Sequence, residues 1–420
     1  PRMKKKQFFV SYLIFILFAI SLIIGFFNGE AISGAGAKKD FYFTWNYVQA
    51  LENNFFVDPT TWTIHTPLHY LILLHLNKVF NSQEIVRFFM VVVSISVPIL
   101  FYLNLKIKFP STKKNILIII AASIFILPSY RYSALWANSH ITAIIFFLLS
   151  TYYFLIWEKS SQKKVKLSIF LSVIFLAASV YTRQYYALFF IYYLFVFYNK
   201  LHIKEFLKII FFIFILSLPG LFFISEYPLL LKNHFFTFRY HNTFLIISSI
   251  ICFYLIPFFF LYCISESKKI LKRKSFISNS IISLIITSVC LLVGFNYFDF
   301  NSGAGGGFFL KFSYFVFKNP YFFFLTSLFG FFMVVFLLKE DKENAIIIIL
   351  LYLGLSGYVI YQKLLEPLFL FIFFLLFKTN LTSNFLKNDK NIYLYFIYFM
   401  LYLISAAFNE YFQISSKLVF

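Results

Sequence analysis

The chain of 420 residues is too apolar to be a soluble domain. Hydrophobic residues make up 61% of it and charged residues 13%, whereas soluble domains are about half apolar and a quarter charged. The formal net charge of +21 does not predict nucleic acid as a partner. The basic residues lie in short clusters between apolar segments, as the cytoplasmic loops of membrane proteins do. We therefore predict an all-α fold, a polytopic transmembrane helix bundle in a lipid bilayer.

The apolar segments predict about 13 transmembrane helices. The first follows residues 1–7, an expected cytoplasmic tail in which Pro1 and Arg2, ahead of Met3, look like an added remnant. A basic start before an apolar segment is also typical of a cleaved signal peptide, but the many later segments favour a retained first helix. The segments span roughly residues 8–27, 85–105, 116–127, 141–157, 167–181, 185–198, 206–224, 244–264, 277–295, 321–338, 345–361, 368–377 and 392–407.

Two parts are expected along the chain. Residues 8–200 form an N-terminal transmembrane module with an outer catalytic loop at 28–84, and residues 201–420 form C-terminal helices whose outer loops face the lipid or the acceptor. Of the 37 Lys and Arg residues, 25 fall in alternate loops that begin with the N-terminus, and the positive-inside rule assigns these loops to the cytoplasm. Nine of the 16 acidic residues and six of the seven histidines fall on the other side. We therefore expect an active site on the outer face, the periplasmic face of a bacterial inner membrane; the alternative is that the outer loops are simply longer.

The first outer loop holds the first candidates for chemistry. We expect an amphipathic helix at Asp40–Asn54 and a short interfacial or re-entrant helix at Pro67–Phe80. Asp40 either caps the first helix or acts as a general base that takes the proton of an attacking hydroxyl. His65 and His69 are four residues apart and would share one face if the segment is helical, and they are candidate contacts of an anionic phosphate. A metal site and an ordinary interfacial role are the alternatives for this pair.

Later outer loops supply the other candidate substrate-binding residues. Arg183 stands between two short apolar segments, where a guanidinium is costly unless it meets water, an acid or an anion. We predict that it binds phosphate, which a guanidinium contacts through two parallel hydrogen bonds. Anchoring at the membrane interface is the alternative for most of these positions. The remaining candidates are Gln184, Arg239, His241, Lys363 and Glu366.

An ordered pattern runs through the first part of the chain: an apolar segment, an outer loop with Asp40, the sequence Thr66-Pro67-Leu68-His69-Tyr70, and then Glu84 and Arg87. This order resembles the N-terminal part of GT-C-type membrane glycosyltransferases, which include protein O-mannosyltransferases and aminoarabinose transferases. Asp40 with Gln49, Asp58-Pro59 and Arg183-Gln184 also resemble the dolichol-phosphate-glucose α-1,2-glucosyltransferases. The resemblance covers roughly residues 8–200. The acidic pair that is usual in the first loop of the family is absent here.

The resemblance implies a GT-C-like fold and the transfer of a sugar, with inversion, from a polyprenyl-phosphate donor. The acceptor would be a lipid-linked glycan, a lipid or a protein. Asp40 would be the general base, and Arg183 with the other basic residues would stabilise the departing phosphate. No cofactor is expected, with a divalent metal as the alternative. Two other functions stay open: a flippase or transporter of lipid-linked saccharides, and an O-antigen-type polymerase or ligase.

Overall fold

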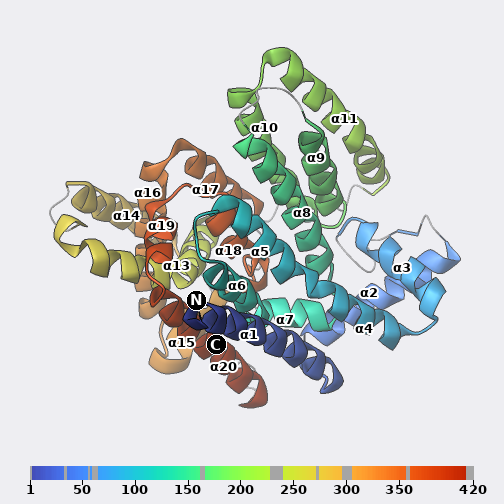
Figure 1. Ribbon diagram of the computed structural model, residues 1–420, viewed down its shortest axis with the longest axis horizontal. Coiled ribbons are helices and arrows are strands. Elements are labelled where there is room, and N and C mark those ends of the chain that lie inside the picture. Colours follow the sequence, from blue (N-terminus) through green and yellow to red (C-terminus); the bar gives the residue numbers. More distant parts are fainter. Residues whose placement is uncertain are drawn as a thin grey trace. The chain divides into compact units, whose positions relative to one another are not determined.

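The computed structural model describes residues 2–32, 36–54, 57–58, 65–160, 166–227, 240–270, 274–295, 305–355 and 360–412. All regular secondary structure among these residues is helical, which confirms the predicted all-α class. The chain divides into two compact units, unit 1 at Pro1–Phe236 and unit 2 at Thr237–Phe420 (Figure 1). The division at residue 200, which was predicted on functional grounds, stays a prediction.

Unit 1 contains both helices that were predicted in the first outer loop. The amphipathic helix begins at Gly36 rather than at Asp40, and the short helix follows Pro67 as predicted. The helices of unit 1 are α1 (Arg2–Phe27), α2 (Gly36–Asn53), α3 (Leu68–Phe80), α4 (Gln83–Ser94), α5 (Ser96–Lys108), α6 (Lys114–Ala122), α7 (Pro128–Leu135), α8 (Ser139–Lys159), α9 (Leu167–Val180), α10 (Leu188–Lys200) and α11 (Ile203–Glu226), with 3-10 turns η2 (Ser123–Ile126) and η3 (Gln184–Ala187).

The spacing of large apolar residues explains how α2 is held. Phe41, Trp45 and Val48 are buried, and their spacing of four and then three residues places them on one face of a helix. Tyr47 joins α2 to α3: its ring meets the ring of Tyr70 edge to face, with the two centroids 4.9 Å apart. Helices α2 and α3 are therefore packed against each other within unit 1.

Unit 2 is organised around its longest helix, α13, which packs against α14, α15, α16, α19 and α20. The approach to α16 is close: a Cβ atom on Gly330 would lie 1.9 Å from the carbonyl oxygen of Ser248 in α13. Helix α18 is buried along its whole length. The helices of unit 2 are α13 (Tyr240–Ile270), α14 (Lys274–Val293), α15 (Gly307–Phe317), α16 (Tyr321–Glu340), α17 (Lys342–Gly354), α18 (Leu368–Leu375), α19 (Asn380–Lys387) and α20 (Asn391–Phe412), with the 3-10 turn η4 (Gln362–Leu364).

Eight helices in the described part of the chain are long and apolar enough to cross a bilayer. They cover residues 9–27, 83–108, 139–159, 203–226, 242–265, 276–293, 321–340 and 391–410. Two bent pairs, α6–η2 with α7 at 67° and α18 with α19 at 88°, raise the number to ten if each pair is one span. The chain is therefore a multi-pass membrane protein. The predicted count of about 13 is not confirmed, because segments such as α9, with 14 residues, are shorter than the roughly 20 residues that a bilayer requires.

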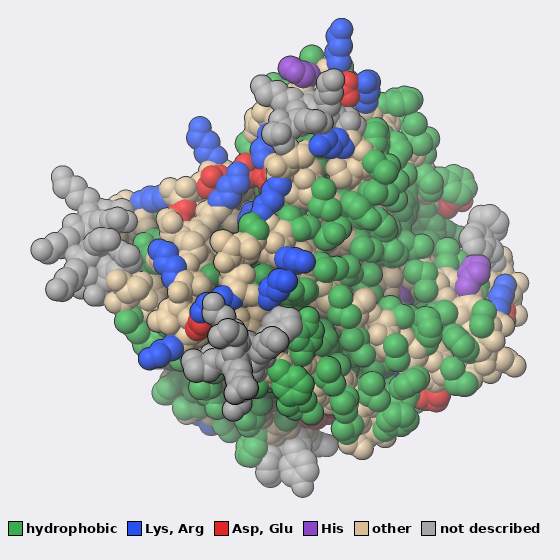
Figure 2. All heavy atoms as spheres, in the orientation of Figure 1, with side chains coloured by type: hydrophobic (Ala, Val, Ile, Leu, Met, Phe, Trp, Pro, Cys, Tyr) green, Lys and Arg blue, Asp and Glu red, His purple; other side chains and the backbone are tan. Residues whose placement is uncertain are grey.

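Helix α11 has an exposed apolar surface of the kind that lipid would cover. Phe211, Leu221 and Phe222 of α11 are each more than half exposed. Figure 2 shows hydrophobic side chains over the region of α11, with basic side chains at the tip where α10 turns into α11. Apolar surfaces of this extent mark contact with lipid or with other proteins, and the length of α11 favours lipid.

The two ends of α8 differ in chemistry. At its C-terminal end, Lys159 caps the carbonyl groups of Ile107 and Lys108, and Glu158 pairs with Lys200 at 2.8 Å. At its N-terminal end, hydroxyl and amide groups of α8 and its N-cap meet the imidazole of His69 from α3 and the guanidinium of Arg183, which follows α9, and the indole of Trp136 lies just ahead of them in the chain. A helix of this length separates the two ends by roughly 30 Å. We call them the lysine end and the polar end of unit 1.

Candidate functional site

Asp40 lies in the second turn of α2 and belongs to the polar end. The helix begins at Gly36, so Asp40 is not its N-cap, and the capping interpretation is wrong. The Tyr132 hydroxyl, from α7, donates a hydrogen bond of 2.9 Å to Asp40 Oδ2. Asp40 is half-buried, whereas Tyr132 is buried. The carboxylate is therefore oriented by a fixed donor and still lies at the surface of unit 1.

A guanidinium group lies beside the helix that carries Asp40. Arg87 of α4 is held between the rings of Phe26 and Trp136, each with its centroid 4.5 Å from the guanidinium carbon, and the ring of Phe41 lies at 6.0 Å. Its Nη2 is 3.1 Å from Glu84, whose side chain is 65% exposed. Its buried Nε has no hydrogen-bond partner among the residues that the structure describes. A guanidinium whose plane is fixed by aromatic rings is suited to an anionic oxygen.

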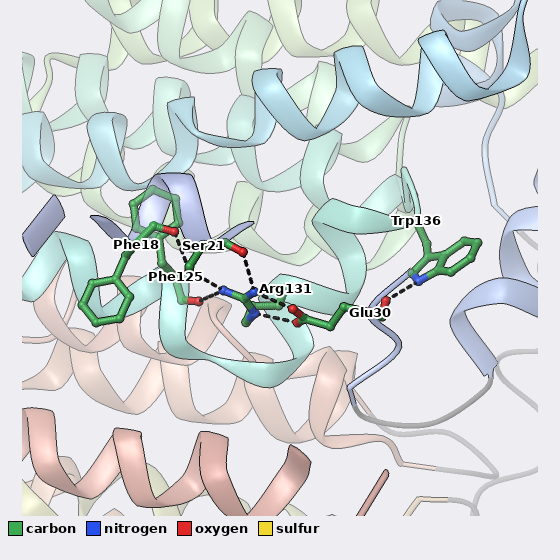
Figure 3. Close-up of polar contacts among 6 residues, drawn as sticks. All are labelled: Phe18, Ser21, Glu30, Phe125, Arg131 and Trp136. Atoms are coloured by element: carbon green, nitrogen blue, oxygen red, sulfur yellow. Dashed lines mark hydrogen bonds and ion pairs between the residues drawn. The ribbon is translucent and has the colours of Figure 1, made fainter. Parts of the chain in front are cut away.

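A largely enclosed ion pair joins the end of α1 to α7 (Figure 3). Glu30 follows α1, and its two carboxylate oxygens accept hydrogen bonds of 2.6 Å from Nε and Nη2 of Arg131 in α7. The Trp136 indole N–H donates to the Glu30 carbonyl oxygen at 2.9 Å. Because both Glu30 oxygens are bound by a guanidinium, Glu30 is unsuited to accept a proton, and Asp40 is the better base.

Sequence reasoning missed Arg131, Tyr132 and Trp136. One signal was present: Arg131 is a lone arginine within PSYRYSALW, between apolar segments, which is the same kind of signal that identified Arg183. Glu30 was counted among the outer acidic residues but was not linked to a basic partner, because the two residues are 101 positions apart.

His69 is fully buried at the polar end, and both of its ring nitrogens are occupied. Nε2 lies 2.9 Å from the carbonyl oxygen of Ala137 and Nδ1 lies 2.8 Å from the Thr142 hydroxyl. A carbonyl only accepts, so Nε2 carries the proton and Nδ1 accepts from Thr142. Burial lowers the pKa of His69 to about 3, which keeps the ring neutral. We therefore do not include His69 among the proposed substrate contacts.

His65 does not share a helical face with His69. Helix α3 begins at Leu68, so His65 lies in the chain ahead of the helix and is half-buried. The expected pairing of the two histidines on one helix is therefore wrong. The role of His65 toward a substrate stays a prediction.

Arg183 is buried. The groups that accept its hydrogen bonds are neutral. Nε donates to the Ser139 hydroxyl at 3.1 Å and Nη2 donates to Asn138 Oδ1 at 2.9 Å. Asn138 is also the N-cap of α8, since its Oδ1 accepts from the backbone N–H of His140 at 3.1 Å. Arg183 thus ties the end of α9 to the start of α8. Gln184 begins η3 and is half-buried.

In unit 2, the candidate residues Lys363 and Glu366 have different surroundings. Lys363 lies over the ring of Tyr361, 5.1 Å from its centroid. Glu366 is buried and accepts hydrogen bonds from the hydroxyls of Tyr254 and Tyr402, the latter at 3.0 Å. Tyr254 in turn accepts from Gln362 at 3.2 Å. Glu366 is therefore the centre of a buried hydroxyl–carboxylate network.

Two candidates fall outside the description. Arg239 lies among residues 228–239, outside the described residues, and the side chain of His241 is likewise not described, although its backbone belongs to α13. Within the described ranges, no three His, Cys, Asp or Glu side chains are placed to hold one metal ion.

Comparisons with protein-family models, with curated proteins and with solved structures give no match to this chain. The residues at the polar end must therefore support any functional conclusion by their own chemistry.

Proposed function

We propose that this chain is a membrane glycosyltransferase. It would move a sugar, with inversion, from a polyprenyl-phosphate-linked donor to a glycan, lipid or protein acceptor. One observation carries the proposal: a half-buried carboxylate is oriented by the Tyr132 hydroxyl, and the ring of Phe41, the next residue in α2, lies 6.0 Å from the guanidinium carbon of Arg87. The likeness of residues 8–200 to GT-C-type glycosyltransferases, on the motifs quoted above, supports the same reaction class by analogy.

The chemistry requires these two groups close together. The acceptor hydroxyl oxygen attacks the anomeric carbon, the bond from that carbon to the phosphate oxygen breaks, and Asp40 takes the hydroxyl proton. General base catalysis of this kind contributes about 10²–10⁴-fold to the rate. The departing lipid phosphate carries its own negative charge and needs a cation rather than an acid, and we assign this role to Arg87.

Arg87 replaces Arg183 in this assignment. The Arg183 guanidinium is buried, and its Nε and Nη2 donate to Ser139 and Asn138, so these two donors are already used in holding α8. Arg87 is already stacked on Trp136 and Phe26, which fixes the plane of its donors before a ligand arrives. The candidates Gln184, Arg239, His241, Lys363 and Glu366 stay predictions.

The separation of charges supports the predicted orientation. In unit 1, Lys159 and Lys200 gather at the lysine end, and Asp40, Arg87 and Glu30 lie at the polar end with the start of α8. The positive-inside rule then assigns the lysine end to the cytoplasm and the polar end to the outer face, which is periplasmic in a bacterial inner membrane.

Transfer of radiolabelled sugar from a panel of polyprenyl-phosphate sugars, with purified protein in detergent, tests the proposal. The Asp40→Asn variant should lose about 10²-fold or more of the transfer rate, and Arg87→Gln should raise the donor KM. The assay run with and without EDTA tests the metal alternative. Full transfer by Asp40→Asn would refute the assignment of the base.

A second function has one observation in its favour. The bent pairs α6–η2 with α7 and α18 with α19 resemble the broken helices on which transporters build their sites, which favours a flippase of lipid-linked saccharides. Reconstitution into liposomes separates the two: a flippase moves the intact lipid-linked saccharide across the bilayer, whereas a transferase consumes the donor on one face.

A further inference from the structure

The Arg131 guanidinium has no donor left for a substrate. Besides its two bonds to Glu30, Nη1 donates to the Ser21 hydroxyl at 3.0 Å and to the Phe125 carbonyl at 3.3 Å, and Nη2 donates to the Ser21 carbonyl at 3.1 Å (Figure 3). A guanidinium has five N–H donors, and here each one has an acceptor. Arg131 therefore acts within the protein, on α1 and on the segment that follows α1.

Helix α7 holds the chain on both sides of the connection between α1 and α2. Arg131 and Trp136 bind the side chain and the carbonyl group of Glu30, which stands just after α1. Tyr132, the residue next to Arg131, binds Asp40 in the second turn of α2. The position of Asp40 relative to α1 is thus set by neighbouring residues of one short helix.

Gly25 of α1 leaves the space that the Glu30–Arg131 ion pair occupies. A Cβ atom on Gly25 would lie 2.4 Å from Glu30 Oε2 and 3.0 Å from Arg131 Nη2. Any side chain at residue 25 would displace the ion pair while leaving both charges in place. Gly25 therefore offers a way to shift the pair without removing either partner.

Trp136 connects the ion pair to the rest of the site. Its ring lies 6.1 Å from that of Phe41, the residue next to Asp40, and 4.5 Å from the guanidinium carbon of Arg87. A displacement of α7 would therefore be transmitted to the proposed base and to the proposed phosphate contact together.

We propose that Arg131 is a positioning residue, whose ion pair with Glu30 fixes α7 so that Tyr132 and Trp136 hold Asp40 and Arg87 in register. The activity part of this inference rests on the proposed glycosyl transfer. Misplacement of reacting groups by about 1 Å costs up to roughly 10²-fold in rate. Loosening the pair should therefore lower kcat and weaken donor binding together.

The test uses Arg131→Lys, which keeps the charge but loses the two-pronged contact, together with Glu30→Gln and Gly25→Ala. The matched control is Glu205→Gln, which removes an ion pair of unit 1 whose lysine, Lys208, is 63% exposed. Trp136 fluorescence, in a protein whose other three tryptophans are replaced by Phe, reports on α7 without any need for activity.

The three variants should shift the Trp136 emission to the red and lower the donor kcat/KM by about 10–10²-fold, while the control changes neither. Unchanged emission in Arg131→Lys and Glu30→Gln would overturn the positioning role. If Arg131→Lys does not fold, Gly25→Ala decides by the same emission test. If the wild type transfers no sugar, the proposed function fails, and the emission test still decides the positioning role.

Discussion

Two arginines of the polar end, Arg183 and Arg87, should respond oppositely, in stability and in donor binding, to removal of their charge. In Arg183→Met the side-chain volume is nearly kept, but two hydrogen bonds from a charged donor, to Ser139 and Asn138, are lost. Each such bond contributes about 1.5–3 kcal/mol to stability. Relief from burying a charge offsets part of the loss. We expect unfolding to become easier by about 3 kcal/mol, with the donor KM unchanged within about twofold.

Arg87→Met should show the reverse pattern. Methionine retains contact with the rings of Phe26 and Trp136, and the pair with the exposed Glu84 contributes only about 0.3–0.5 kcal/mol. We expect a loss of stability of about 1 kcal/mol and a donor kcat/KM lowered about tenfold or more. Stability is measured from the unfolding midpoint in detergent with increasing denaturant, and donor KM and kcat from the transfer assay. An intermediate loss of stability is expected for Arg183→Lys, which keeps the charge but cannot make both bonds.

The opposite result for Arg183→Met, in both stability and donor KM, would refute this reasoning. If Arg183→Met unfolds within about 0.5 kcal/mol of the wild type and raises the donor KM about tenfold, the contacts seen at α8 do not hold Arg183 in place. The sequence-based assignment of Arg183 to the phosphate would then be right.

Three further predictions concern stability. Burial lowers the pKa of His69 from 6.5 to about 3, so as the pH falls the unfolded chain takes up the proton first. Between pH 8 and pH 5 the unfolding free energy of the wild type should therefore fall by about 2 kcal/mol more than that of His69→Gln. Parallel profiles of unfolding free energy against pH would contradict this. Gly330→Ala should destabilise by about 1–3 kcal/mol because α13 and α16 must separate, whereas Gly36→Ala, whose nearest atom would be 3.6 Å away, should be neutral; equal unfolding midpoints would count against the close helix contact. Tyr402→Phe removes a donor to the buried Glu366 carboxylate and should cost about 1.5–3 kcal/mol in unfolding free energy, and an unchanged midpoint would show that this hydroxyl does not hold the network.

The sequence was sufficient to predict the helices because their signals are local. The apolar segments and the spacing of Phe41, Trp45 and Val48 are visible within a few residues, and the structure forms helices over them. The number of spans was harder, since a short apolar segment reads the same whether it is a span or half of a bent pair such as α18 with α19. Composition carries no information about a bend of that kind.

The candidate site depends on contacts that no local signal contains. The sequence indicated that Arg183 is buried at a cost, but not that its acceptors are Asn138 and Ser139, about 45 positions earlier. It placed Asp40 in the first outer loop but could not indicate that Tyr132 orients it. Partners far apart in sequence are set by how helices pack, and without relatives to compare, a single chain does not reveal them.

The difference in burial between the ends of unit 1 argues that the polar end has a role beyond stability. At the lysine end, the basic member of the ion pair stays partly in water: Lys200 is 38% exposed, and its partner Glu158 is 15% exposed. At the polar end, Arg131 is 6% and its partner Glu30 15% exposed, and Arg183 and Arg87 are also largely enclosed. Enclosed charge is costly and is often no more stabilising than an apolar replacement. Arg131 and Arg183 donate to groups within the protein, so under the proposed function it is the enclosed Arg87, stacked on Phe26 and Trp136, whose burial is better explained by a role toward a ligand than by stability alone.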